Sequence, residues 1–374
     1  MIQSIKQSVP GSKIFLRKMM LLIFLIFPFF AANAQKEIKW IEGRKIGLEN
    51  RLLPKKPRQH FYDRLPIELK DNVRKRVWDL SRHSAGLVLR FTSNTKKLTV
   101  KYRTRFNNQM PHMTKVGVRG IDVYVKENDM WRWAAASKPQ ENTWHGTLLS
   151  GMPEKTREYK IYLPAYDGID SLWVGIDQGA SLKSRPDNVD KPHSIAFYGT
   201  SIIQGCSASR PGMVPTNQID LRMDAQVINL GFSGNGTLDI PMARFLGQMK
   251  LSCLVLDCTP NLPADSIFRK TVRFVEVFRS YSPNIPIVLV GNAGHQNRWL
   301  IESHQQTYIE KNRQTERAYR ELQRHEAEKI RFIHGSRLLS SDYESTVDGV
   351  HYTDRGFHTY VEEVLPLLRQ LLEE

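Results

Sequence analysis

The feature that most constrains the fold is an alternation of short apolar runs with longer helical segments in the C-terminal half of the chain. Short buried strands that alternate with helices are typical of a parallel sheet covered on both faces. We therefore predict a flavodoxin-like, three-layer α/β domain over residues 193–374, with reactive residues at the carboxyl ends of its strands. The predicted strands are Ser194–Tyr198, Gln226–Leu230, Cys253–Asp257, Pro286–Val290 and Ile330–Ile333. The predicted helices are about Ile240–Met249, Ser266–Ser280, Ser303–Lys329 and Asp354–Leu372.

The preceding part of the chain, residues 36–177, has the pattern of short strands separated by polar turns. Leu87–Phe91 and Leu98–Tyr102 flank the polar turn Ser93–Thr95, which predicts a β-hairpin. Because no long helical period interrupts this half, we expect an antiparallel β-sandwich of the jelly-roll kind, joined to the α/β domain by a linker over residues 178–192. Further predicted strands are Gly120–Val125, Tyr159–Leu163 and Leu172–Ile176.

The first 34 residues have the three parts of a secretory signal peptide. Cations precede the apolar stretch Met19–Phe30, and Ala32–Ala34 offers a small-residue cleavage site. The apolar stretch is shorter than the about 20 residues that a transmembrane helix needs. We expect cleavage after Ala34 and export to the periplasm or the medium, without stable membrane insertion; an uncleaved anchor is the alternative. The cations are Lys6, Lys13, Arg17 and Lys18.

The formal charge of +16 becomes +12 when the four cations of the first 34 residues are removed. A positive balance favours acidic partners in general, but these cations are scattered along the chain, and export argues against nucleic acid as a partner. Cys206, Cys253 and Cys258 lack metal-ligand spacing. Their odd number leaves both one disulfide and free thiols open.

Residues suited to nucleophilic catalysis follow the first predicted strand and precede the last helix. Gly199 and Thr200 lead into Ser201, and glycine allows a sharp turn that exposes the serine hydroxyl, although these residues also suit a helix cap. Asp348 and His351 share one loop. A neutral imidazole can accept the serine proton, and a carboxylate fixes the imidazole's tautomer. Ser201, His351 and Asp348 are therefore the candidate catalytic residues, and their chemistry requires no metal or other cofactor.

The segments after the second and third predicted strands carry groups that can stabilise negative charge. Glycines between Gly231 and Gly236 allow a backbone N–H to point into the crevice, and Asn261 can present its side-chain amide. Ordinary turns are the alternative explanation for both segments.

In combination, these blocks resemble the SGNH-hydrolase (GDSL-like) superfamily, in the branch whose nucleophile motif is Gly-Thr-Ser-Ile. The resemblance implies a serine esterase with an oxyanion hole formed by the N–H groups of Ser201 and Gly234 and the side chain of Asn261. Thr259–Asn261 departs from the family's Gly-x-Asn-Asp block. The N-terminal half resembles the β-domain named for a Gly-x-Asp-Leu-Tyr motif. The matching blocks are Trp78–Gly86, Gly120–Tyr124, Gly199–Gly205, Asn229–Gly236 and Asp348–His351.

The same resemblance implies small acyl groups, typically acetyl, on a carbohydrate substrate. Arg82, His83 and His295 are candidates for substrate contact. Arg82 and His83 are equally explained as residues that bond loop carbonyls, whereas a solvated loop histidine is the favoured explanation for His295. The alternative functions are a lipase or thioesterase for longer acyl chains, and a non-catalytic carbohydrate-binding protein. Aromatic residues that suit either sugar stacking or core packing are Trp131, Trp133, Trp144 and Tyr166.

Overall fold

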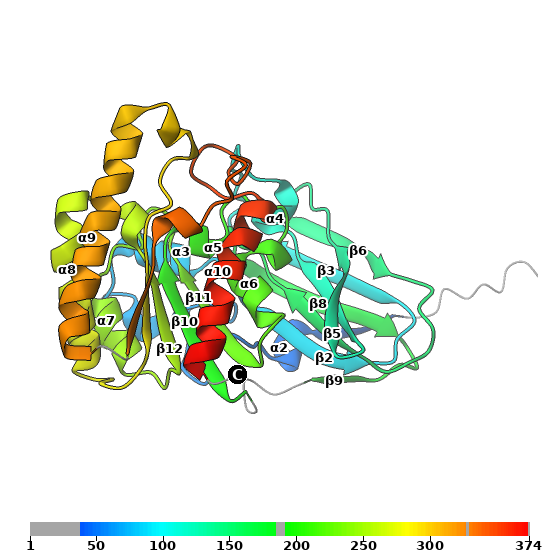
Figure 1. Cartoon of the computed structure of the whole chain (residues 1–374). Coiled ribbons are helices and arrows are strands. Elements are labelled where there is room, and N and C mark those ends of the chain that lie inside the picture. Colours follow the sequence, from blue (N-terminus) through cyan, green and yellow to red (C-terminus); the bar gives the residue numbers. More distant parts are fainter. Residues whose placement is uncertain (1–37, 185–190, 327–328, 373–374) are drawn as a thin grey trace, which may run out of the picture.

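The computed structural model describes residues 38–184, 191–326 and 329–372. The predicted signal peptide, residues 1–34, lies outside the described residues. A β-sandwich and an α/β unit lie side by side along one long axis (Figure 1). Within the described ranges, no helix combines the length and apolar character needed to cross a membrane.

The C-terminal half is built on a five-stranded parallel sheet in the order β11-β10-β12-β13-β14. Counted along the domain this order is 2-1-3-4-5, which is the flavodoxin-like order, so the predicted fold class is confirmed. Each strand begins and ends within one residue of its predicted bounds. The strands are β10 (His193–Gly199), β11 (Ala225–Gly231), β12 (Cys253–Asp257), β13 (Ile287–Val290) and β14 (Ile330–Ile333).

Helices cover both faces of this sheet, and each strand contributes to two cores. On β10, Ala196 and Tyr198 pack into the core formed with α7, α8 and α9, whereas Ile195 and Phe197 pack into the core formed with α5, α6 and α10. Successive side chains of a strand point to opposite faces, so a strand buried on both faces is apolar throughout. Figure 1 shows the α5, α6 and α10 layer between the sheet and the β-sandwich. The helices are α5 (Ser201–Gln204), α6 (Pro215–Asp220), α7 (Ile240–Gly247), α8 (Ala264–Arg279), α9 (Glu302–Glu326) and α10 (Asp354–Leu372).

The N-terminal half contains two antiparallel sheets, as predicted, in the orders β1-β8-β3-β6 and β5-β4-β7-β2-β9. Their inner faces meet in one apolar core that includes Phe91, Val100 and Tyr159. The strands are β1 (Ile38–Glu42), β2 (Val88–Ser93), β3 (Leu98–Thr104), β4 (Asp122–Glu127), β5 (Met130–Ala136), β6 (Thr143–Leu149), β7 (Arg157–Tyr162), β8 (Ile169–Asp177) and β9 (Leu182–Ser184).

The predicted hairpin of Leu87–Phe91 with Leu98–Tyr102 is wrong. β2 pairs with β7 and β9, whereas β3 pairs with β6 and β8, so the turn between them crosses from one sheet to the other. The Asp177 carboxylate at the end of β8 fixes this crossing, because it accepts hydrogen bonds from the Lys96 N–H at 2.8 Å and the Thr95 hydroxyl at 3.1 Å. Polar turn residues predict a change of direction, but they do not specify the partner strand.

Short helices interrupt the N-terminal half, and one of them belongs to the core of the α/β unit. Val77 and Trp78 pack with residues of α7 and α8. The buried Arg64 donates to the carbonyls of Gly231 at 2.8 Å and Leu80 at 2.6 Å. The two halves therefore share a core, and the domain division at residues 178–192 stays a prediction. The short helices are α2 (Gly43–Ile46), α3 (Lys75–Ser81) and α4 (Lys115–Arg119).

A buried ionic cluster joins the two halves at a second place. The Asp220 carboxylate on α6 lies 2.6 Å from the Lys160 ammonium of β7 and 2.9 Å from that of Lys191. Burial alone would raise the pKa of Asp220, but the two ammonium groups outweigh it and hold the pKa well below its usual value. Because removing one partner would leave a buried charge uncompensated, this cluster holds the sandwich in one position against α6.

Candidate active site

Ser201 is the first residue of α5 and follows β10 after a single intervening residue. A Cβ atom at Gly199 would overlap the Ile203 side chain and lie 2.9 Å from the Asp257 carbonyl, so only glycine fits at this turn. The Thr200 hydroxyl accepts the Ile202 N–H at 3.3 Å and caps α5. The helix cap and the position of the nucleophile candidate at the carboxyl edge of the sheet are therefore two consequences of one turn.

The loop before α10 brings His351 to Ser201 from 150 residues along the chain. The His351 Nε2 atom lies 3.0 Å from the Ser201 Oγ atom, and its Nδ1 atom lies 2.7 Å from the Asp348 Oδ2 atom. The other Asp348 oxygen accepts the N–H groups of Val350 at 3.0 Å and His351 at 2.8 Å. The structure thus places the three predicted catalytic residues in one hydrogen-bonded line.

The electrostatics of Asp348 suit a group that must remain ionised. Partial burial alone would raise its pKa, but the hydrogen bonds from the His351 backbone, the His351 ring and the Val350 backbone outweigh this effect. The pKa of Asp348 is lowered to about 2. Its carboxylate is therefore negative at every pH at which an imidazole can act as a base.

Gly234, the predicted backbone donor, lies in the loop that follows β11. Its φ of +67° is in the left-handed region, and a Cβ atom there would meet no atom within 4 Å. Gly236 packs directly against the Gly199 carbonyl, which places this loop beside the start of α5. In the part of the chain that the structure describes, the Gly234 N–H has no hydrogen-bond acceptor.

Asn261 ends a short helical turn that follows β12, the strand paired with β10 in register at Gly199 and Asp257. It therefore lies at the same edge of the sheet as Ser201. Its Nδ2 atom is shielded from solvent and has no acceptor among the described residues. Leaving such a donor unpaired costs about 1–3 kcal/mol, so this nitrogen is available for a hydrogen bond to a group outside the described side chains.

His83 reaches the base of this site indirectly, through Gln204 of α5. The Gln204 amide nitrogen lies 3.0 Å from His83 Nδ1, and the Gln204 Oε1 atom accepts the Ser233 N–H at 2.9 Å. His83 Nε2 lies 3.2 Å from the Asn108 amide. Through Gln204, His83 thus positions the segment that carries Gly234. Because His83 is buried, its environment does not support the prediction that it contacts substrate directly.

Stability should depend on pH through His83. Burial lowers the pKa of His83 to about 3, with a smaller contribution from neighbouring guanidinium groups, whereas an unfolded chain takes up this proton near pH 6.5. Acidification between these values therefore favours the unfolded state, by up to about 1.4 kcal/mol per pH unit. Urea unfolding measures the free energy of unfolding at pH 7 and at pH 5. The decrease between the two pH values should be smaller for His83→Gln than for the wild type, and the control His358→Gln, at an exposed histidine, should lose as much as the wild type. Equal losses in all three proteins would contradict this assignment.

The other two predicted contact residues make their observed ring contacts with side chains other than Ser201. The Arg82 guanidinium lies 5.4 Å from the ring centroid of Phe106. The His295 ring stacks on His304 at 4.0 Å and lies behind the loop of Asp348, 3.9 Å from where a Cβ atom of Gly349 would be. Direct substrate contact by either residue stays a prediction.

The aromatic residues singled out in the N-terminal half fall into two groups. Tyr166 is buried and Trp144 packs on Tyr102, as core packing predicts. The Trp133 ring is 52% exposed, although its Nε1 atom donates to Asp122 at 2.7 Å. Trp131 is half-buried beneath Lys160, whose ammonium lies 4.8 Å from its ring.

His112 is a residue of the site that sequence reasoning missed. It lies in the loop between β3 and α4, and its ring stacks on the His351 ring with centroids 5.1 Å apart and planes at 16°. Its Nε2 atom lies 3.1 Å from the Cys206 Sγ atom. Cys206, like Cys253 and Cys258, is buried and free, so no disulfide forms. No local motif marks His112, because its position depends on the packing of the sandwich against the α/β unit.

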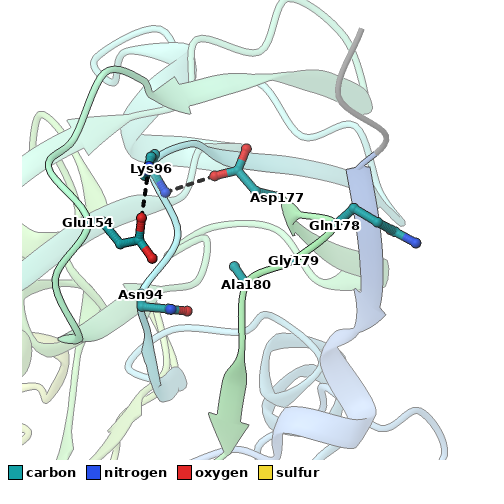
Figure 2. Close-up of a pocket in the computed structure, with 7 residues that line it drawn as sticks. All are labelled: Asn94, Lys96, Glu154, Asp177, Gln178, Gly179 and Ala180. Carbon is teal, nitrogen blue, oxygen red and sulfur yellow. Dashed lines mark hydrogen bonds and ion pairs between the residues drawn. The ribbon is translucent and has the colours of Figure 1, made fainter. Parts of the chain in front are cut away.

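A hollow of about 440 Å³ lies away from these residues, at one end of the β-sandwich. Figure 2 shows that Lys96, Glu154 and Asp177 surround it, with Lys96 bonded to both acids. None of the predicted site residues lines this hollow. Lys96 pairs with both acids, and the hollow has no part in the chemistry considered below.

Comparisons with known proteins agree with this architecture. Residues 192–369 match the model of the GDSL-like Lipase/Acylhydrolase family, and residues 38–182 match the model for the N-terminus of SGNH-hydrolase-type esterases, named GxDLY. No curated protein matches the chain. A protein from Bacteroides ovatus classed as a GDSL-like lipase shares 28% identity, with 90% of this chain and 98% of that chain covered and a TM-score of 0.84.

Two more distant structures share the fold. A salicylyl-acyltransferase from a tetracycline biosynthetic pathway is 17% identical, with 89% and 97% of the two chains covered and a TM-score of 0.69. An acetyl xylan esterase from the rumen bacterium Butyrivibrio proteoclasticus is 11% identical, with 90% and 99% covered and a TM-score of 0.53. Because the two family models together span nearly all of the described chain, the protein belongs to the GDSL-like lipase/acylhydrolase family and is an SGNH-type esterase with a GxDLY N-terminal domain.

Proposed function

We propose that Ser201, His351 and Asp348 form a catalytic triad that removes small acyl groups, acetyl foremost, from carbohydrate esters. The observation that carries the proposal is the line of hydrogen bonds from Ser201 Oγ to His351 Nε2, at 3.0 Å, and from His351 Nδ1 to Asp348, at 2.7 Å. These contacts join a nucleophile, a base and a group that orients the base, which is what acyl transfer through a serine requires.

In the proposed reaction, the Ser201 hydroxyl attacks the ester carbonyl carbon while His351 Nε2 accepts its proton. Asp348 holds the Nδ1 proton and stabilises the imidazolium cation. His351 then protonates the leaving alcohol, which leaves an acyl group on Ser201. Water, activated by the same imidazole, attacks this acyl-enzyme and releases the carboxylic acid and free Ser201.

The negative oxygen formed in each step is proposed to be bound by the N–H groups of Ser201 and Gly234 and by the Asn261 amide. Two observations support this assignment: the open space at Gly234 and the shielded, unpaired amide nitrogen of Asn261. Donors that are already in place stabilise developing charge without reorganising, and this is usually a large part of catalysis by such enzymes.

A carbohydrate ester is the proposed substrate class for two reasons. One structural neighbour is an acetyl xylan esterase. In this chain, Trp299 and Tyr343 are 67% and 59% exposed, and their ring centroids lie 6.3 Å apart. Trp299 lies in the segment after β13, and Tyr343 lies in the loop that carries Asp348. Exposed aromatic rings beside a reaction centre are suited to stacking on sugar rings, and apolar patches of this kind mark binding sites. Export, which the N-terminal segment predicts, is part of this proposal because it gives access to polymeric substrates.

A comparison of acyl chain lengths and polymers tests the substrate proposal. We expect wild-type enzyme to hydrolyse p-nitrophenyl acetate faster than p-nitrophenyl butyrate and to release acetate from acetylated xylan or acetylated pectin. The measurement is the ratio of kcat/KM values for the two small esters, together with acetate release from each polymer. A clear preference for butyrate, with no acetate released from either polymer, would favour the lipase or thioesterase alternative.

A further inference from the structure

Three potential metal ligands from separate parts of the chain meet beside the triad. They are His112 from the loop after β3, Cys206 just beyond α5, and His351; we call them the thiol–imidazole cluster. One ligand atom of each lies within 4.8 Å of the other two. The reaction proposed above uses only His351, so His112 and Cys206 have no role in it.

We propose that the thiol–imidazole cluster binds a zinc ion and that the bound ion inhibits the enzyme. One thiolate and two imidazole nitrogens form the mixed sulfur and nitrogen set that Zn²⁺ prefers, and three protein ligands leave a fourth position for water. The ion would occupy the lone pair of His351 Nε2, the atom that faces Ser201 Oγ at 3.0 Å. That lone pair is the one that must accept the serine proton, so the zinc-bound protein cannot activate its nucleophile.

Asp348 already supplies the outer contact that such a ligand needs. Histidines that bind zinc almost always donate their other ring N–H to a carboxylate or carbonyl, which fixes the tautomer and orients the ring. His351 Nδ1 lies 2.7 Å from the Asp348 carboxylate. The contact that prepares His351 to act as a base therefore also prepares its Nε2 atom to bind a metal.

Binding requires one rotation and one proton transfer. The rings of His112 and His351 are nearly parallel, at 16°, so their in-plane lone pairs converge only after His112 turns about its χ2 bond, a broad torsion. The Cys206 thiol then exchanges its proton for the ion, which gives a zinc thiolate and one proton released to solvent. Because a proton is released, inhibition should strengthen as the pH rises.

The first test is inhibition of p-nitrophenyl acetate hydrolysis by zinc chloride, with each protein compared to its own metal-free rate. His112→Ala and Cys206→Ser should each raise the inhibition constant at least about tenfold, since even outer contacts of metal ligands matter that much. Cys253→Ser, another buried free thiol, and His358→Ala, an exposed imidazole, are controls that should retain the wild-type constant. An unchanged inhibition constant in both cluster variants would overturn the proposal. If Cys206→Ser does not fold, the inhibition constant of His112→Ala alone decides the test, because His112 lies in a half-buried loop that should tolerate the substitution.

The second test does not depend on activity. Cobalt(II) added to Ser201→Ala protein, which retains the whole cluster, should produce a near-ultraviolet thiolate-to-cobalt absorption band and release one proton per ion. Zinc should displace the cobalt, and the band should be lost in the Ser201→Ala/Cys206→Ser double variant. Absence of the band in Ser201→Ala, or its persistence in the double variant, would contradict a zinc site here, whatever the outcome for the proposed esterase mechanism.

Discussion

Replacing Ser201 by alanine is expected to lower kcat for p-nitrophenyl acetate by a factor on the order of 10⁶, leaving only the residual rate that substrate binding and the oxyanion hole supply. The nucleophile of the proposed mechanism is the Ser201 hydroxyl, which lies 3.0 Å from His351 Nε2. Without it no acyl-enzyme forms, and the remaining groups can only bind the ester. Initial rates under saturating substrate measure the change.

The matched control for this variant is Ser252→Ala. Ser252 lies at the amino end of the same sheet, where its hydroxyl accepts the Ser194 N–H at 3.1 Å. Loss of this hydroxyl therefore removes one hydrogen bond but no group that takes part in the proposed reaction. We expect near wild-type kcat from Ser252→Ala and a folded Ser201→Ala protein in thermal unfolding. Wild-type turnover by folded Ser201→Ala protein would remove Ser201 from the mechanism.

Asparagine at position 348 should lower kcat by a factor on the order of 10⁴, even though the side chain keeps its size. The amide carries no charge to stabilise the imidazolium cation, and it can turn its NH₂ group toward His351 Nδ1, which favours the wrong tautomer. Because the pKa of Asp348 is lowered to about 2, the wild-type carboxylate stays ionised throughout the assay range. The loss should therefore appear at every pH between 5 and 9 in a kcat profile.

Asp342→Asn is the control for this second variant. Asp342 lies in the same loop, but its carboxylate contacts Ser340 and Arg355 and makes no contact with His351. The control should keep most of its activity. If both variants lost activity equally, the effect would belong to the structure of the loop, and full activity in Asp348→Asn would exclude the proposed role of Asp348.

Much of the fold could be predicted because the α/β strands are buried on both faces. All five residues of β12 are buried, and such runs between amphipathic helices leave few alternatives to a parallel sheet. That sheet order then places the ends of β10 and β12 side by side, which is why Ser201 and Asn261 could be assigned to one edge from their positions after the strands.

The remaining features depend on contacts that no local pattern encodes. The partner strands of β2 were mispredicted because a polar turn serves equally well in a hairpin and in a crossing between sheets. His112 lies in a loop of the N-terminal half, so its contact with His351 depends on how the sandwich packs against the α/β unit; Lys160 binds Asp220 of α6 there, and Arg64 binds the Gly231 carbonyl of β11. The role of His83 also depends on a distant contact, because its ring bonds to Gln204, a residue 121 positions away in the sequence.

Ser201 is the proposed nucleophile, and covalent modification by a p-nitrophenyl phosphonate ester tests this role most directly. The modified residue is identified by peptide mass spectrometry. A serine made nucleophilic by His351 should displace p-nitrophenol from phosphorus and carry the phosphonyl group itself. We expect one phosphonyl group per protein, on the peptide containing Ser201, in step with loss of esterase activity. Complete inactivation with the label on another residue, and with Ser201 unmodified, would contradict the account.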